Sequence, residues 1–219
     1  MDHLMNRKIS PGPSFPKRGT HGKVGRTTGQ DKKHIVVCVT GASGAVYALE
    51  LIRWLAGNGY RVHAVASETG EKVFAYETGV NFSARALAGT SGALTVHGND
   101  DLFSPLSSGS HGFDAAVVVP CSMGTLGRIA SGSGSKLIER VADVALKEHR
   151  RLVVVPRETP LNMLHLENML KLAAAGAVIL PAMPGFYQKP ESVADVVRFM
   201  VSKILDALDI PNVLYKRWE

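Results

Sequence analysis

Short, largely apolar segments recur along this chain, and most are followed by a turn and then by a helical segment. The segments expected to be strands are Ile35–Val39, Arg61–Ala66, Ala115–Val119, Leu152–Val155 and Ala177–Leu180, with a shorter one at Leu94–His97. Apolar strands without alternation are buried on both faces, which is typical of parallel sheets covered by helices. The sequence therefore predicts an α/β fold, a three-layer sandwich with a central parallel sheet.

The connecting segments have the period of amphipathic helices. In the first of them, apolar residues recur at Val46, Leu49, Ile52 and Leu55. The expected helices are Ala45–Ala56, Glu68–Tyr76, Ser135–Glu148, Leu161–Ala174 and Glu191–Leu208. Residues 77–112 are expected to be irregular, and Gly and Ser punctuate Ser122–Gly134. The pattern shows no internal repeat and no second domain.

The net charge of +6 comes entirely from the first 33 residues. They carry eight Lys or Arg and two Asp, whereas residues 34–219 carry seventeen basic and seventeen acidic residues. We predict a disordered basic extension at 1–33, followed by one domain at 34–219. An inert extension is favoured over a transit peptide, which Asp2 and the Pro-Gly-Pro run fit poorly, and over an arm that binds nucleic acid.

The apolar runs and the cysteines indicate in which cellular compartment the protein is expected. No apolar run approaches the ~20 residues needed to span a bilayer, and no signal-peptide core is present. Cys38 and Cys121 lie in or beside apolar strands, so we expect buried thiols in a reducing cytoplasm rather than a disulfide. Cys121 has no evident His partner and is interpreted as structural.

The first strand ends in the turn Thr40-Gly41-Ala42-Ser43-Gly44-Ala45. Its backbone N–H groups and the start of the next helix form a natural anion site. The turn is not a G-x-G-x-x-G motif, and the second strand ends in Ser67 rather than in an acidic residue. A mononucleotide phosphate, such as that of FMN, therefore fits better than a dinucleotide. The alternative is a tight turn that binds nothing.

A second turn, Pro120–Thr125, also follows a strand and also consists of small residues. Its hydroxyl and N–H groups suit a flavin edge or a phosphate, although a helix N-cap at Ser122 explains the pattern nearly as well. A third loop, Met183–Gln188, points aromatic groups toward the same edge of the sheet, or else plugs the sheet end. No metal is expected, because His165 and Glu167 are two residues apart and lie on different helix faces.

Charged residues surround the strand Leu152–Val155. Arg157 and Glu158 follow it after Pro156, at the position that lines the ligand crevice in open α/β sheets, and Arg140 and Lys147 precede it. Charges at the mouth of a buried strand are costly unless a charged ligand or partner answers them. This grouping predicts a site that holds phosphate and moves a proton. The alternative is a solvated run of charges along a helix.

Together these motifs resemble those of the UbiX-type flavin prenyltransferases, over essentially all of residues 34–219. The segments that carry the resemblance are TGASGAVY, SETGEKVFAYETG, VVVPCSMGTL, KLIERVADVALKEHRRLVVVPRETPLNMLHLENMLKL, GAVILPAMPGFYQKP and the closing KRWE. The resemblance implies a flavodoxin-like (Rossmann-like) sandwich in a large homo-oligomer, a dodecamer in known members. It implies transfer of a dimethylallyl group from dimethylallyl phosphate to N5 and C6 of reduced FMN, without a metal. The product, prenylated FMN, is the cofactor of UbiD-type decarboxylases.

The resemblance also implies roles for individual residues. The FMN-binding residues are Gly41, Ala42, Ser43, Ser67, Ser122, Met123, Gly124, Thr125 and Arg157. The catalytic residues are Glu77 and Glu158, as acid/base carboxylates, with the cations Lys147 and Arg140. The residues that hold or enclose the dimethylallyl phosphate are Tyr187, Lys203 and Trp218.

These roles agree with the chemistry of the reaction. A phosphate monoester is a poor leaving group, so cations and a phenol must stabilise its departing charge. Two positions depart from the family pattern. Lys203 stands where arginine is usual, and it keeps the charge but lacks the bidentate fork. Leu102 stands where some members have tryptophan, and the neighbouring Phe103 would point differently.

Two other functions remain open at this stage. A flavin-dependent cysteine decarboxylase would need a catalytic histidine, and His63, His97 and His111 lie in no recognisable context of that kind. A non-catalytic FMN carrier would need neither Glu77, Glu158 nor the cations. The sequence also leaves open whether the donor is dimethylallyl phosphate or the diphosphate, since both present the same allyl group.

Overall fold

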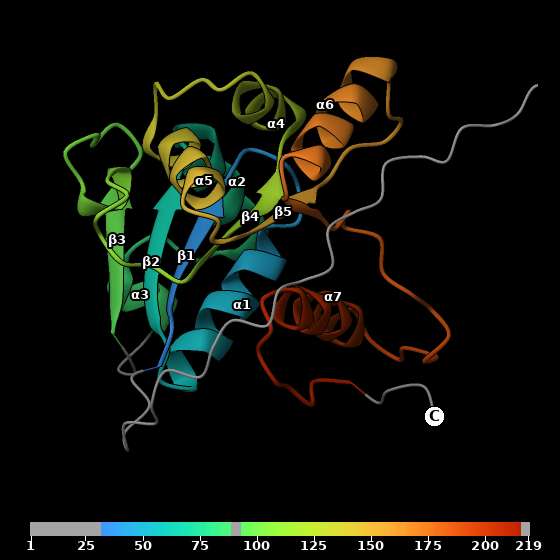
Figure 1. The fold of residues 1–219 in the computed structure, drawn as a ribbon. Helices are drawn as coiled ribbons and strands as arrows, with labels where there is room; N and C mark the ends of the chain where they lie inside the picture. The colour runs from blue at the N-terminus through green and yellow to red at the C-terminus, as the bar shows by residue number, and fades with distance from the viewer. Residues whose placement is uncertain (1–31, 89–92, 216–219) are drawn as a thin grey trace, which may run out of the picture. The chain divides into compact units, whose positions relative to one another are not determined.

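The computed structural model describes residues 32–88 and 93–215, and within them six strands form one parallel sheet in the order β3-β2-β1-β4-β5-β6 (Figure 1). The strands are β1 (His34–Val39), β2 (Arg61–Ala66), β3 (Leu94–Gly98), β4 (Ala115–Cys121), β5 (Arg151–Pro156) and β6 (Val178–Ile179). All neighbouring pairs are parallel. The predicted α/β sandwich with a central parallel sheet is confirmed, although β6 is shorter than predicted.

Helices connect the strands and cover both faces of the sheet (Figure 1). They are α1 (Ala45–Gly57), α2 (Glu68–Thr78), α3 (Ala84–Ala88), α4 (Met123–Ala130), α5 (Leu137–Lys147), α6 (Met163–Ala174) and α7 (Val193–Ala207), with a 3-10 turn at Pro105–Ser107. Five of these match predicted helices to within two residues at most ends. Helix α4 lies in the segment interpreted as punctuated by Gly and Ser, and it begins at the Ser122 cap that was weighed as an alternative.

The strand order reverses between β1 and β4. From β1 the chain winds outward through β2 to β3, and then returns to place β4 on the other side of β1. Without the edge strand β3, the order is that of flavodoxin-like folds, and with β3 it is that of the Rossmann fold. The carboxyl ends of β1 and β4 therefore form the switch point at which such folds bind ligands.

Two apolar cores lie on the two faces of the sheet. Along β1, Ile35, Val37 and Val39 pack with residues of α1 and α7, whereas Val36 and Cys38 pack with residues of α4 and α5. This explains why β1, β4 and β5 show no polar alternation, since neither of their faces meets solvent. Cys38 and Cys121 are buried, free thiols in the second core, as predicted, and burial raises the pKa of Cys121 to about 12.

The prediction of disorder for residues 1–33 falls almost wholly outside the described residues and stays a prediction. Among the residues that the structure describes, no helix is both long and apolar enough to cross a membrane.

Four histidines gather on the α5 side of the sheet, around β2 and β3. His63 on β2 approaches His97 on β3, with 3.0 Å between Nδ1 and Nε2. The rings of His34 and His111 lie 6.2 and 6.1 Å from that of His63. Burial, the three neighbouring imidazoles and Arg61 lower the pKa of His63 from its ordinary 6.5 to about 4.

This cluster predicts a loss of stability in mild acid. The unfolded chain binds a proton at His63 below about 6.5, whereas the folded chain binds it only near 4, so the free energy of unfolding falls as the pH drops through that window. His63→Gln should reduce this loss by about 1 kcal/mol, a value discounted for partial exposure. Urea denaturation at pH 7 and pH 5 measures the difference. Equal pH dependence in the two proteins would show that His63 carries none of it.

Candidate functional site at the switch point

Thr40, a residue that is only 1% exposed, joins the carboxyl ends of β1 and β4 through its hydroxyl. Thr40 Oγ1 donates to the carbonyl oxygen of Pro120 (2.8 Å), and the backbone N–H of Thr40 donates to the same oxygen (3.2 Å). The N–H of Ser122 donates to Thr40 Oγ1 (2.7 Å). One side chain therefore fixes the turn after β1 against the turn after β4.

The first turn needs its glycines. A Cβ on Gly41 would lie 2.6 Å from Cγ2 of Thr69, so only glycine allows α2 to approach this closely. Gly44 is the N-cap of α1 and has a φ of 108°, a left-handed conformation that favours glycine. Because Gly44 has no side chain, another residue must cap α1.

That cap is Glu77, near the end of α2. Its Oε2 accepts the N–H groups of Gly44 (2.9 Å) and Ala45 (2.8 Å). Burial raises the pKa of Glu77, but hydrogen bonds from Ser43, Gly44 and Ala45, together with the charge of Arg157, hold it below its usual value overall. Part of the anion site predicted in the first turn is thus filled by a carboxylate of the chain itself.

Ser67 brings the end of β2 to the same place. Its N–H donates to the carbonyl of Val39 (3.0 Å), and its Oγ caps α2 by accepting the N–H of Gly70 (3.0 Å). A Cβ on Gly70 would lie 2.7 Å from the oxygen of Val39, which again forces glycine at a close approach. The Ser67 hydroxyl therefore lies beside the first turn.

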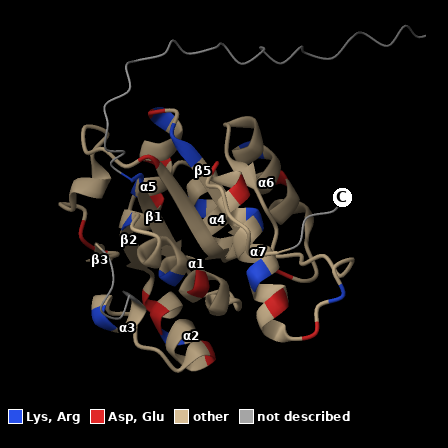
Figure 2. Cartoon of the chain, turned by 90° about the horizontal axis from the view of Figure 1, so that it is seen from below, with Lys and Arg blue, Asp and Glu red and all other residues tan. Residues whose placement is uncertain are grey.

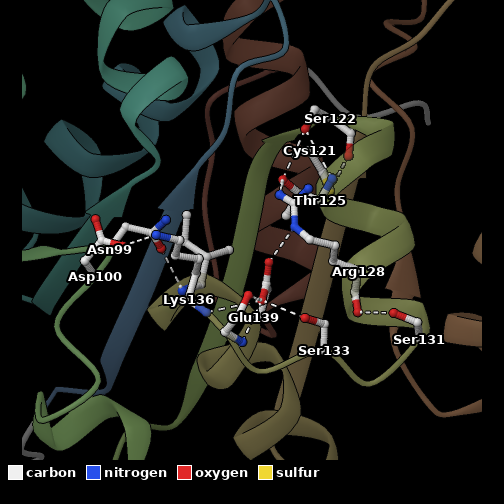
Figure 3. Close-up of polar contacts among 12 residues, drawn as sticks. Asn99, Asp100, Cys121, Ser122, Thr125, Arg128, Ser131, Ser133, Lys136 and Glu139 are labelled. Atoms are coloured by element: carbon white, nitrogen blue, oxygen red, sulfur yellow. Dashed lines mark hydrogen bonds and ion pairs between the residues drawn. The ribbon is translucent and has the colours of Figure 1, made fainter.

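The second turn begins α4. Ser122 Oγ accepts the N–H of Thr125 (3.4 Å) and donates to Thr125 Oγ1 (3.1 Å), as Figure 3 shows. Met123 and Gly124 form the first helical turn between them, so their N–H groups belong to the start of α4. The starts of α1 and α4 both present positive helix ends at the switch point, which favours an anionic ligand.

Arg157 connects the two turns from the end of β5. Its N–H donates to the carbonyl of Cys121 (3.1 Å), and its Nε donates to the carbonyl of Ser43 (3.3 Å). Glu158 follows as an exposed carboxylate, whose Oε1 accepts the N–H of Thr159 (3.0 Å). A guanidinium thus lies between the two turns, and the exposed Glu158 is its neighbour in the sequence.

Tyr187 and Lys203 form a second group, on the α7 side of the sheet. The ring of Tyr187 lies 5.8 Å from that of Phe199, edge to face, and Lys203 Nζ lies 5.6 Å from the centre of the same ring. A hydrogen bond with Tyr215 raises the pKa of Lys203, so this lysine stays charged. Tyr187 and Lys203 therefore lie near the same phenyl ring, and their joint role at a phosphate stays a prediction, while Trp218 lies outside the described residues.

Arg140 and Lys147 do not join Arg157 and Glu158 within this chain, contrary to the grouping expected from the sequence. Lys147 is the last residue of α5, just before β5 begins, whereas Glu158 follows the end of β5, so the two residues lie at opposite ends of this strand. Lys147 pairs with Glu148 (2.7 Å). Arg140 pairs with Asp143 (2.7 Å) and donates to the carbonyl of Ser107 (3.3 Å). Spacing along the sequence could not reveal this, because helix α5 runs antiparallel to the strand that follows it.

The structure also shows residues that the sequence did not single out. Thr40 lies inside the recognised turn, but nothing in its spacing reveals its link to β4. Arg128 and Glu139 lie eleven residues apart on different helices and form a partly buried ion pair (2.5 Å) behind the second turn. Leu102 and Phe103 are exposed on the loop after β3, at the far edge of the sheet from β5, and so supply no aromatic wall beside Arg157 in this subunit.

Figure 2 shows basic and acidic residues interspersed on helices such as α2 and α7. This agrees with the balanced charge of residues 34–219, and it leaves the local cation Arg157 as the electrostatic feature of the switch point.

Comparison with known proteins gives a consistent result. The sequence matches the Flavoprotein family model over residues 25–205. It is 48% identical over 188 residues to the flavin prenyltransferase UbiX of Halalkalibacterium halodurans, and this alignment covers 83% of the chain and 91% of that protein.

Solved structures agree. The chain is similar to a UbiX in complex with FMN and dimethylallyl pyrophosphate, with a TM-score of 0.81 and 44% identity over 86% of this chain and 98% of the other. It is also similar to a dodecameric FMN-dependent UbiX-like decarboxylase of Escherichia coli O157:H7, with a TM-score of 0.78 and 39% identity over 85% and 99%. The peptidyl-cysteine decarboxylase EpiD, at 14% identity and a TM-score of 0.55, shares the fold alone.

The capping role of Glu77 can be tested by Glu77→Gln. The amide can still accept a hydrogen bond but loses the charge at the start of α1, so the free energy of unfolding at pH 7 should fall by about 1 kcal/mol. Because the folded pKa of Glu77 is lowered, the stabilisation is present above its ordinary value of 4.5 and is lost as the pH falls through the lower folded value. Wild type and variant should therefore converge in acid.

The control is Glu71→Gln, which removes an exposed carboxylate from the same helix. It should cost only a few tenths of a kcal/mol. Equal losses for the two variants, or a difference that persists in acid, would contradict the capping role.

Proposed function

The chain belongs to the UbiX family of flavin prenyltransferases, and on that premise we propose that it joins the dimethylallyl group of dimethylallyl phosphate to N5 and C6 of reduced FMN. The observation that carries the proposal is the meeting of two small-residue turns, a guanidinium and two carboxylates at the switch point of the sheet. A parallel α/β sheet binds its ligand at this position.

The groups at the switch point fit FMN. Glu77 already takes the N–H groups of Gly44 and Ala45, so the phosphate is held nearer Gly41, Ala42 and Ser43, with Ser67 beside them. The flavin ring lies by the second turn, formed by Ser122, Met123, Gly124 and Thr125. Arg157, between the turns, supplies positive charge to either part. When bound, reduced FMN supplies the nucleophilic ring atoms of the reaction.

Tyr187 and Lys203 bind the phosphate of the donor. The phenol ring and the ammonium both lie close to the Phe199 ring, and both can stabilise the charge of the departing phosphate. The resemblance gives the role of enclosing the donor to Trp218, which lies outside the described residues. A lysine at position 203 offers a point charge without a fork, so it discriminates less between phosphate and diphosphate than arginine would.

Bond making and breaking require a proton acceptor. The carbon–oxygen bond of the donor breaks, and phosphate leaves with the electron pair while carbon bonds form at N5 and C6. Protons leave N5 and C6, of which one goes to the middle allyl carbon and the other to phosphate. Glu158 is the better base, because Glu77 is held as a carboxylate by three hydrogen bonds and has a lowered pKa. Glu77 serves by fixing the first turn.

The protein acts as a homo-oligomer. Helix α6 exposes an apolar face made up of Met163, Leu164, Leu166 and Leu170. An exposed apolar patch of this kind marks an interface, and the similar protein of Escherichia coli O157:H7 is dodecameric. Lys147 is remote from the switch point of its own chain, and Arg140 is engaged by Asp143 and Ser107, so in this proposal both cations serve a neighbouring subunit.

The product leaves for another enzyme. Prenylated FMN is the cofactor of a UbiD-type decarboxylase, which is the recipient in this proposal. Two buried, reduced thiols support a cytoplasmic location. A cysteine decarboxylase is disfavoured, because the clustered histidines His63, His97 and His111 lie around β2 and β3 and not at the carboxyl ends of β1 and β4.

The function is tested under anaerobic conditions with purified protein, reduced FMN and dimethylallyl phosphate, followed by mass analysis of the extracted flavin. We expect FMN to gain one C5H8 unit. A parallel reaction with dimethylallyl diphosphate identifies the donor. FMN that is bound but unmodified with both donors would contradict prenyl transfer and would support a flavin carrier.

Glu158→Gln separates chemistry from binding in the same assay. It should leave FMN affinity within about twofold of wild type and reduce transfer by about a hundredfold or more, because a general base is lost. Glu68→Gln, which removes an exposed carboxylate paired with Lys72, is the control and should change neither value. An unchanged rate in Glu158→Gln would remove this residue from the mechanism.

A further inference from the structure

Glu139 is a carboxylate that is only 1% exposed, beneath the turn that links α4 to α5. Its Oε1 accepts Nε of Arg128 at 2.5 Å. Its Oε2 accepts the N–H groups of Ser135 (2.9 Å) and Lys136 (3.2 Å), and the hydroxyls of Ser133 (3.1 Å) and Ser135 (2.9 Å). A buried carboxylate is tolerated only when it is bonded this fully, so its position is fixed.

Arg128 connects the fixed carboxylate of Glu139 to the second turn (Figure 3). While Nε bonds to Glu139, Nη2 donates to Thr125 Oγ1 at 3.0 Å. Thr125 Oγ1 also accepts the hydroxyl of Ser122, and the N–H of Ser122 donates to Thr40. An unbroken chain of hydrogen bonds thus runs from Glu139 to the link between β1 and β4.

The chain orients the hydroxyls of the second turn. Thr125 Oγ1 accepts two hydrogen bonds, one of them from a charged donor, so both of its lone pairs are engaged. The Ser122 proton is directed at Thr125, and Ser122 Oγ meets a ligand mainly as an acceptor. Without Arg128, both hydroxyls would be free to rotate, and the turn would lose this fixed pattern of donors and acceptors.

We propose that Arg128 and Glu139 are positioning residues for flavin binding, which act through the Thr125 and Ser122 hydroxyls without touching the flavin. This inference rests on the proposed function, because it assumes that the second turn binds FMN. The fork geometry of arginine is essential, since one guanidinium donates to Glu139 and to Thr125 through separate nitrogens. A lysine at position 128 can keep the pairing with Glu139 but cannot span both partners.

A double-mutant cycle of Arg128→Lys and Thr125→Val tests the proposal, with the dissociation constant of FMN as the measured quantity. Each single variant should weaken FMN binding about tenfold, because each breaks the charged hydrogen bond that orients the turn. The double variant should bind FMN no more weakly than whichever single variant has the lower FMN affinity, because Arg128 acts through Thr125. Losses that multiply would show that Arg128 acts independently of Thr125, which would overturn the proposal.

Arg151→Lys is the matched control. Arg151 also forms an ion pair, with Asp209, but it is the first residue of β5 and so lies at the end of the strand away from the switch point. This variant should leave FMN affinity unchanged. Equal weakening by Arg151→Lys and Arg128→Lys would indicate a general effect of lost ion pairs and would contradict positioning.

Glu139→Gln provides a second readout if Arg128→Lys folds poorly. It should weaken FMN binding in the wild-type background but not in the Thr125→Val background. Prenyl transfer at saturating FMN should recover in both Arg128→Lys and Glu139→Gln, since a positioning residue alters affinity more than turnover. A wild-type chain that binds FMN without transferring prenyl groups would refute the proposed function alone, whereas one that binds no FMN would refute both.

Discussion

The hydroxyl of Thr40 is the interaction on which the rest of the site depends. It satisfies the buried carbonyl of Pro120 and the N–H of Ser122, two backbone groups that lie beyond the regular bonding of the sheet. By joining β1 to β4 at the switch point, it sets the two turns side by side. The starts of α1 and α4 then point their positive ends at one place, and Arg157 adds a cation between them.

Charged residues at this edge divide into those that build the site and those that remain available for chemistry. Glu77 caps α1, and Glu139 anchors Arg128 behind the second turn, so both carboxylates are engaged in hydrogen bonds to backbone or guanidinium groups. Glu158 stays exposed at the mouth of the strand. A site that must hold phosphate and also accept a proton benefits from this division, because the engaged carboxylates keep lowered pKa values and are poor bases.

Much of the fold could be predicted from the sequence, because buried parallel strands leave continuous apolar segments such as Ile35–Val39. The two turns were also predictable, since Gly41 and Gly44 meet steric demands that only glycine satisfies. The contacts between distant segments were not. Nothing in the spacing of Glu77 and Gly44 indicates that one caps the other's helix. The charges of α5 were grouped with Arg157 because they are close in sequence, yet the helix places Lys147 at the amino end of β5, away from Arg157 at its carboxyl end.

A crystal structure of the protein with FMN tests the central claim most directly. The account predicts that the phosphate of FMN lies against Gly41–Ser43 and that the flavin ring lies beside Ser122–Thr125. Helices α1 and α7 also enclose a groove lined by Val46, Glu50, Val197 and Arg198, with a volume of about 310 Å³. FMN bound in that groove, with the two turns empty, would contradict the account.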